Sequence, residues 1–163
     1  MKHDELERQQ VLEACCIMDT LPSEAYDRIV KLAAMIFDVP IALVSLIDKD
    51  RQWFKAKVGI DATETPREWA FCDFAIRSPK LFEITDPEGD ARFCDNPMVT
   101  GPPYIRYYAG MPLISPEGYA LGTLCIIDTN KRAPLTEPRR QILSELSDMV
   151  MHEIEIHRKS ITS

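Results

Sequence analysis

The segment "PIALVSLIDKDRQWFKAKVGI", residues 40–60, decides the fold because it holds two strand patterns separated by a short polar turn. Residues 40–48 are apolar and rich in β-branched side chains, as expected of a strand that is covered on both faces. After the turn "KDR", residues 52–60 alternate between two sets, which are Phe54, Ala56 and Val58 on one side and Trp53, Lys55 and Lys57 on the other. This pattern predicts a β-hairpin.

A second hairpin is predicted nearer the C-terminus. It comprises residues 105–114, the turn "SPEG" at 115–118, and residues 119–128. Proline at the second turn position and glycine at the fourth suit a type I turn. The runs 41–47 and 120–127, one from each hairpin, are apolar on both sides, so the sheet that they form needs a covering layer on each face.

Helical patterns flank the two hairpins. A first helix is expected from Asp4 to Cys16, and a second begins after Ser23 as N-cap and stops before Pro40. A last helix, capped by Thr136, carries apolar residues at near-heptad spacing, namely Ile142, Leu146, Met149 and Ile156. We expect the terminal helices, within residues 1–20 and 136–160, to cover one face of the sheet.

The segment 61–104 is expected to form a lid over the other face. It holds six of the twelve prolines, and a connection of this length in a compact domain usually covers a binding site. Within it, "EWAFCDFAI" (68–76) is predicted to be a short helix and "LFEITD" (81–86) a short strand. The space between lid and sheet is the predicted pocket, and the residues expected to line it are Trp53, Phe71, Cys72, Asp86, Asn96, Tyr108 and Thr123.

Composition restricts the classes of function. The 163 residues, 45% of them hydrophobic, suffice for one domain of ordinary size spanning 1–163. The net charge is −7 and no basic run exceeds a pair, which argues against nucleic acid and anionic membrane as partners. No apolar stretch approaches the roughly 20 residues of a membrane helix, and the first residues lack the apolar core of a signal peptide, so a cytoplasmic location is expected.

Cys72 is the candidate reagent among five cysteines that form no CxxC pair. A cysteine nucleophile needs a thiolate, which a nearby cation or a histidine base normally provides. The three histidines, His3, His152 and His157, all lie in the expected terminal helices, and Asp73 beside Cys72 should raise the pKa of the thiol. We therefore interpret Cys72 as part of a pocket wall and predict no catalytic residue.

Three long strings resemble GAF domains, the small-molecule-sensing and dimerising modules of bacterial signalling proteins. They are "VPIALVSLIDKDRQWFKAKVGIDATETPRE", "ARFCDNPMVTGPPYIRYYAGMPLISPEGYALGTLCIID" and "LTEPRRQILSELSDMV". The chain is similar, over about residues 5–155, to the subgroup found at the N-terminus of histidine kinases and diguanylate cyclases. The resemblance implies an α+β fold with a central antiparallel sheet, terminal helices on one face and a lidded pocket on the other. Any kinase or cyclase activity would belong to an attached output domain.

The resemblance leaves the ligand open, because GAF domains hold cyclic nucleotides, bilins, haem, small metabolites or nothing known. Where the subgroup commonly reads "SFCAHAI", this chain has "AFCDFAI", with Ala70 in place of serine and Phe74 in place of histidine. The bilin-attaching cysteine of phytochrome-related GAF domains is followed by histidine, and no Cys-His pair occurs here. The cysteines also lack the spacing of metal ligands. Neither a bilin nor a metal is favoured, and the cofactor stays unknown.

We interpret the chain as a sensory or regulatory domain that is not itself an enzyme and binds an unidentified small molecule. Occupancy would shift the arrangement of the terminal helices, and a homodimer through those helices is expected because the apolar arc of the last helix exceeds one contact with its own sheet. Two alternatives stay open. One is a cysteine-dependent redox enzyme or sensor resembling free methionine sulfoxide reductases, in which Cys72, Cys94 and Cys125 converge, and the other is a ligand-free dimerisation module.

Overall fold

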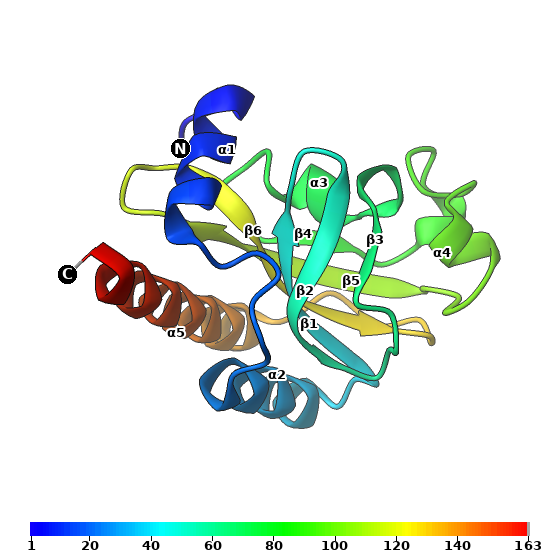
Figure 1. Cartoon of the computed structure of the whole chain (residues 1–163). Coiled ribbons are helices and arrows are strands. Elements are labelled where there is room, and N and C mark those ends of the chain that lie inside the picture. Colours follow the sequence, from blue (N-terminus) through cyan, green and yellow to red (C-terminus); the bar gives the residue numbers. More distant parts are fainter. Residues whose placement is uncertain (163) are drawn as a thin grey trace.

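The computed structural model describes residues 1–162, which contain one six-stranded sheet with every neighbouring pair antiparallel (Figure 1). The strand order is β3-β2-β1-β6-β5-β4. Both predicted hairpins are confirmed, and they join where β1 pairs with β6. The strands are β1 (Ile41–Ile47), β2 (Arg51–Val58), β3 (Glu64–Pro66), β4 (Phe82–Ile84), β5 (Tyr107–Ile114) and β6 (Ala120–Asp128).

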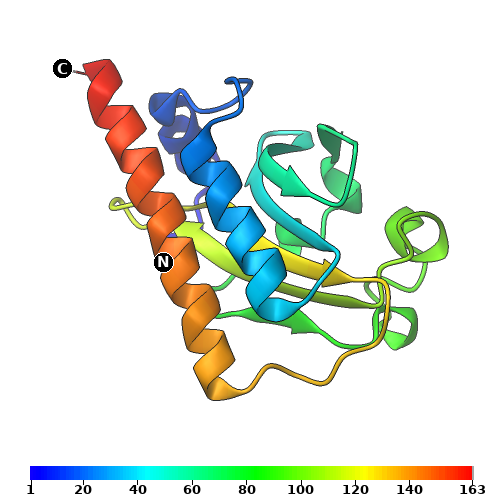
Figure 2. The ribbon, with the colours of Figure 1, turned by 90° about the horizontal axis from the view of Figure 1, so that it is seen from below.

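Three longer helices cover one face of the sheet, and α2 and α5 run side by side across it (Figure 2). They are α1 (Glu5–Cys15), α2 (Glu24–Phe37) and α5 (Glu137–Thr162), close to the predicted bounds. Asp4 caps α1, since its carboxylate accepts a hydrogen bond from the amide of Glu7 at 3.0 Å. Ser23 precedes α2 as predicted, but its side chain makes no capping hydrogen bond. Across residues 1–162, no helix combines the length and apolar character needed to cross a bilayer.

The segment 61–104 lies on the other face, but it also extends the sheet. Its short helices are η1 (Arg67–Trp69), α3 (Cys72–Ala75), η2 (Pro87–Gly89) and α4 (Pro97–Thr100). The predicted strand within 81–86 is confirmed as β4, and the predicted helix within 68–76 is confirmed as α3 preceded by η1. Sequence patterns did not predict β3, which has three residues.

The sheet divides the apolar core into two layers, as its apolar runs predicted. We call the layer under α1, α2 and α5 the helix-side core and the layer under segment 61–104 the lid-side core. In β1, Val44 and Leu46 belong to the helix-side core, whereas Leu43 and Ile47 belong to the lid-side core. Because β1 and β6 are buried at every position, neither layer can be removed without exposing the centre of the sheet.

A β-bulge in β2 reverses part of the predicted alternation. The pairing of β2 with β1 skips Lys55, which is the extra residue of the bulge. As a result Trp53 packs with Ala56 in the helix-side core, while Phe54 faces the lid. The predicted grouping of Phe54 with Ala56 is therefore wrong, and Trp53 does not lie under the lid.

Gly122 of β6 provides a test of the central pairing. A methyl group added there would overlap the carbonyl oxygen of Ser45 and lie 2.8 Å from the Cα of Leu46, and both are backbone atoms of the paired strand β1, which cannot rotate away as a side chain could. We expect Gly122→Ala to lower the free energy of unfolding, measured by urea denaturation, by about 3 kcal/mol.

Gly101→Ala is the matched control for this prediction. Its added methyl would meet one carbonyl oxygen, that of Pro97, at 3.0 Å, outside the sheet. The expected loss is below about 1 kcal/mol. If both variants lose equal stability, the close approach of β1 and β6 is not what excludes a side chain at position 122.

Candidate functional site

The thiol of Cys72, the first residue of α3, lies at the centre of the lid-side core. Its Sγ accepts hydrogen bonds from the hydroxyl of Tyr108 on β5 and the hydroxyl of Thr123 on β6, both at 3.1 Å. Cys72 is 2% exposed, and Tyr108 and Thr123 are fully buried. One lid residue is thus held by two strands of the sheet through polar contacts within an apolar layer.

A row of buried polar side chains leads across the sheet to this thiol. Ser45 lies opposite Thr123 in the β1–β6 pairing. The hydroxyl of Ser45 donates to Oε1 of Gln52 at 2.7 Å, and the amide of Gln52 donates to the hydroxyl of Thr65 at 3.0 Å. The row connects four strands, β3, β2, β1 and β6, beneath the lid. Because buried polar groups need partners, these side chains fix one another in place.

Cys125 of β6 is the second thiol at this centre. Burial opposes the ionisation of both cysteines, but the hydrogen bonds that Cys72 accepts from Cys125, Thr123 and Tyr108 lower its pKa below that of an ordinary thiol. Burial raises the pKa of Cys125 well above its usual value, and the hydrogen bond to Cys72 raises it further. The first proton to leave this pair is therefore that of Cys72.

The predicted effect of Asp73 on Cys72 is wrong. The carboxylate of Asp73 is held by Arg67 at 2.9 Å and by Arg77 at 3.1 Å. Two guanidinium groups therefore offset its charge. The local sequence suggested a raised pKa for Cys72, whereas hydroxyl donors from distant strands lower it.

Aromatic side chains fill the space around the thiol pair. Phe71 stacks on Phe93 with ring centroids 4.1 Å apart, and its ring lies 5.2 Å from that of Tyr108. Phe74, which stands where related domains commonly carry histidine, packs edge-on against Phe93 at 5.1 Å. In this conformation the space predicted to be a pocket is therefore occupied by the side chains of the lid and sheet themselves.

The seven residues expected to line a pocket divide into groups. Phe71, Cys72, Tyr108 and Thr123 meet at the centre just described. Trp53 lies on the opposite face of the sheet because of the bulge at Lys55. A bulge cannot be seen in the alternation of side chains, so this separation could not be predicted.

Asp86 and Asn96 lie in the lid, and their contacts are those of capping residues. The carboxylate of Asp86 accepts from the amide of Gly89 at 3.2 Å and caps η2. The side chain of Asn96 accepts from the amide of Met98 at 2.8 Å and caps α4. Sequence reasoning missed Ser45 and Gln52, although a serine in the apolar run of residues 41–47 is a visible signal of a buried polar contact. It named Cys125 only as part of the redox alternative.

The three cysteines of the redox alternative do not all converge. Cys94 is half-buried, and its thiol lies 3.9 Å from the carbonyl oxygen of Ala91. The centre contains Cys72 and Cys125 alone among the five cysteines. Within residues 1–162, no three His, Cys, Asp or Glu side chains gather in a way that could hold a metal ion.

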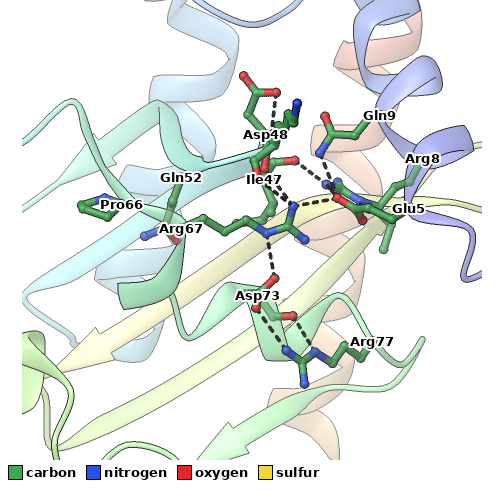
Figure 3. A network of polar contacts seen from close by, with 12 residues as sticks. Glu5, Arg8, Gln9, Ile47, Asp48, Gln52, Pro66, Arg67, Asp73 and Arg77 are labelled. Atoms are coloured by element: carbon green, nitrogen blue, oxygen red, sulfur yellow. Dashed lines mark hydrogen bonds and ion pairs between the residues drawn. The ribbon is translucent and has the colours of Figure 1, made fainter.

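A second polar cluster joins the lid to α1 (Figure 3). Arg67 of η1 donates from Nη1 to the carboxylate of Glu5 at 2.6 Å and to the carbonyl oxygen of Asp48 at 3.0 Å. Arg8, which is 5% exposed, also binds Glu5 and donates to the carbonyl oxygen of Ile47 at 2.7 Å. The hydrogen bond from Arg8, with that from Arg67, holds the pKa of Glu5 well below its usual range despite partial burial.

A third cluster joins the lid to α5 through Glu83 of β4. Its carboxylate accepts from the hydroxyl of Tyr107 at 2.6 Å, from the backbone amide of Leu135 at 2.8 Å and from Arg140 at 2.9 Å. The side chain of Glu83 is 8% exposed, so solvent screens these contacts little. The start of the last helix is therefore fastened to a strand of segment 61–104.

An open groove of about 700 Å³ runs between α2 and α5 on the outer side of the helix layer. Its floor is apolar and its rim is charged. Beside it, α5 exposes apolar side chains every seventh residue, Ile142, Met149 and Ile156. The groove is lined by Glu24, Ala25, Arg28, Ile29, Leu32, Glu145, Asp148, Met149, His152 and Glu153.

The hydroxyl donors at Cys72 can be tested individually. Tyr108→Phe removes one donor and keeps the ring, so we expect the pKa of the Cys72 thiol to rise. The measurement is the pH dependence of the 13Cβ chemical shift of labelled Cys72. Tyr107→Phe is the matched control, because the Tyr107 hydroxyl binds Glu83 on the opposite face. An unchanged titration in Tyr108→Phe would show that the Tyr108 hydroxyl does not lower the pKa of Cys72.

Comparisons with known proteins identify the family of the chain. The family model described as GAF domain matches residues 22–154. The cyclic di-GMP phosphodiesterase PA2567 of Pseudomonas aeruginosa is 41% identical over 157 residues, which are 96% of this chain and 27% of that protein. The chain thus spans about a quarter of the length of this curated relative.

Solved structures share the fold at low sequence identity. The free methionine-R-sulfoxide reductase of Neisseria meningitidis has a TM-score of 0.68 at 16% identity, with 98% of this chain and 96% of that chain covered. The GAF domain of an Acinetobacter phosphoenolpyruvate-protein phosphotransferase has a TM-score of 0.65 at 14% identity, with 95% of each chain covered. These likenesses concern the fold alone. Because the family model matches most of its length and the fold agrees, this chain belongs to the GAF domain family.

Proposed function

We propose that this GAF domain is the sensory and regulatory module of a bacterial signalling protein, in which the lid communicates with the terminal helices. The observation that carries the proposal is that charged side chains tie segment 61–104 to both ends of the chain. Arg67 binds Glu5 of α1, and Glu83 binds Arg140 of α5. The similarity to a cyclic di-GMP phosphodiesterase supports an output that controls cyclic di-GMP hydrolysis by a catalytic region beyond the aligned residues.

The two ties differ in strength. Glu5 is half exposed, so solvent screens its ion pair with Arg67. Glu83 is nearly buried and accepts three hydrogen bonds, one of them from the backbone just before α5. Charge-assisted hydrogen bonds in a region of low dielectric are the stronger kind. Movement of β4 would therefore shift the start of α5 more directly than movement of η1 would shift α1.

The ligand that we propose is a small molecule that enters between lid and sheet near Phe71, Cys72, Tyr108 and Thr123. These side chains pack on one another in the structure, so ligand entry requires the lid to move. A ligand that binds the open arrangement better than the closed one would shift the two populations. The same movement would pull on the ties to α1 and α5.

The assembly that we propose is a homodimer through α2 and α5. Leu32 and Ile36 on α2 and Ile142, Met149 and Ile156 on α5 are all at least 37% exposed. An exposed apolar surface of this kind usually marks an interface, and the seven-residue spacing on α5 suits a helix packed against a helix. A two-fold arrangement would place the α5 helices of two copies together, where a shift of each helix start could be transmitted.

Removal of the charge on Glu83 tests the relay. Glu83→Gln keeps the shape of the side chain and weakens its contacts with Arg140, so we expect faster amide hydrogen exchange in the first turns of α5. Arg92→Met is the control, since Arg92 pairs with Asp90 within the lid and touches neither terminal helix through that contact. Unchanged exchange in α5 of the Glu83 variant would show that the tie does not hold the helix.

The proposed dimer is tested by a charge on its apolar stripe. We expect the full chain to sediment as a dimer at micromolar concentration and Met149→Glu to raise the dissociation constant at least tenfold, which corresponds to about 1.4 kcal/mol. Gln141→Glu adds the same charge at an exposed polar position of α5 and should leave the constant unchanged. A full chain that is monomeric at high micromolar concentration would rule out this interface.

The proposed ligand is tested by comparing the native and denatured masses of freshly purified protein. We expect an adduct in the native spectrum that is lost on denaturation, because a ligand held by packing and hydrogen bonds dissociates when the fold is lost. Tyr108→Ala, which removes part of the proposed site, should lose the adduct, whereas Tyr104→Ala on the exposed outer surface should keep it. Retention of the adduct by the Tyr108 variant would place the ligand elsewhere.

A further inference from the structure

The thiols of Cys72 in the lid and Cys125 in the central sheet belong to one buried cluster beneath α3. The Sγ of Cys72 lies 3.1 Å from the hydroxyl of Thr123, and Cys125 follows two residues later on β6, facing the same side. Both thiols are reduced and both are buried. Opposite Cys125 in the β5–β6 pairing is Gly110, which leaves room for the hydroxyl of Tyr108 above it.

We propose that Cys72 and Cys125 are a redox-reactive thiol pair that a peroxide converts into a disulfide, joining the lid covalently to the central strand β6. No regulatory ligand and no dimer is needed for this reaction, although it uses the same buried centre as the proposed small-molecule site. It also differs from a three-cysteine redox centre, because Cys94 lies outside the contact.

The reaction balances in two steps. The sulfur of Cys72 attacks one oxygen of hydrogen peroxide, the O–O bond breaks, and the second oxygen leaves as water with the thiol proton, so that Cys72 becomes a sulfenic acid. The sulfur of Cys125 then attacks the sulfur of Cys72, the S–O bond breaks, and the oxygen leaves as water with the proton of Cys125. Two thiols lose two electrons in total, and one peroxide is reduced to two waters.

The surroundings assign different roles to the two sulfurs. Hydroxyl groups of Tyr108 and Thr123 point hydrogen atoms at Cys72 and stabilise negative charge on it, which makes it the attacking sulfur. Burial and the contact with Cys72 keep Cys125 protonated, and burial also raises the pKa of Cys15, to about 11. Cys125 is therefore the resolving thiol, and Cys15, which belongs to the helix-side core, takes no part in the pair.

The disulfide would fasten the middle of the lid. At present α3, a helix of four residues, is held to β5 and β6 by hydrogen bonds and packing, which permit reversible separation. A covalent bond to β6 would stop the lid from opening at that point. Oxidation would thus hold the domain in its closed arrangement.

Trypsin separates the cysteines cleanly, which makes the pairing directly measurable. Cleavage after Lys and Arg puts Cys72 in peptide 68–77, Cys125 in 107–131, Cys94 in 93–106, and both Cys15 and Cys16 in 9–28. The full chain is treated with hydrogen peroxide, blocked with N-ethylmaleimide and digested without reductant. We expect peptide 68–77 joined to 107–131, with a mass two hydrogen atoms below the sum and with loss of the species on reduction.

Two results of this map would overturn the proposal. One is the absence of that linked species at a peroxide concentration that already oxidises the exposed Cys16. The other is peptide 68–77 linked to 93–106 in its place, which would make Cys94 the partner. Either result leaves the dimer and the lid relay untouched, because neither depends on a disulfide.

Single substitutions then test the two roles. In Cys125→Ser the sulfenic acid on Cys72 has no resolving thiol, so dimedone should label peptide 68–77 at least tenfold more than in the unsubstituted chain. Cys94→Ser is the matched control and should leave the amount of linked species unchanged. Circular dichroism checks that Cys125→Ser is folded, and Cys125→Ala serves if it is not. Equal dimedone labelling with and without Cys125 in a folded chain would contradict its role.

Discussion

The pairing of β1 with β6 is the constraint on which the rest of the structure depends. Both strands are buried at every position, so the sheet needs a covering layer on each face. The terminal helices form one layer and segment 61–104 forms the other. At the middle of this pairing Ser45 lies opposite Thr123, and these hydroxyls need partners inside an apolar layer. The thiol of Cys72 and the amide of Gln52 are those partners, so the lid is placed by the polar needs of the sheet.

Much of the fold follows from the sequence because long apolar runs and helical spacing depend only on local pattern. Both hairpins, the three long helices and the lid are of this kind. The bulge at Lys55 is different, because a single extra residue leaves the composition of a strand unchanged while it exchanges the faces of Trp53 and Phe54. The same limit applies to the site. The sequence identifies Cys72 as a candidate, but its hydrogen-bond donors come from strands far along the chain. The neighbouring Asp73 therefore predicts a raised pKa for Cys72, whereas those donors lower it.

The two faces of the sheet differ in how their residues are held. The helix-side core mixes aliphatic side chains with aromatic ones such as Phe37 and Trp53, and leaves apolar side chains of α5 exposed. The lid-side core combines stacked aromatic rings with a row of buried polar groups. Apolar packing tolerates small sliding of helices, while a satisfied polar row specifies one arrangement. The helix layer therefore offers an adaptable surface where a partner could dock. The lid-side core has one fixed arrangement, in which a chemical change could be detected.

The segment that covers the sheet also supplies both of its margins. β3 pairs with β2 at one edge and β4 pairs with β5 at the other, and both strands belong to segment 61–104. Because segment 61–104 is hydrogen-bonded to the sheet at two opposite edges, it cannot rotate away as a rigid body about one edge. It can only move outward between the two edge strands, at η1 and α3, which lie between β3 and β4 along the chain. An outward movement of α3 would pull on β3 and β4 at the same time. A chemical change at α3 would therefore affect both edges of the sheet together.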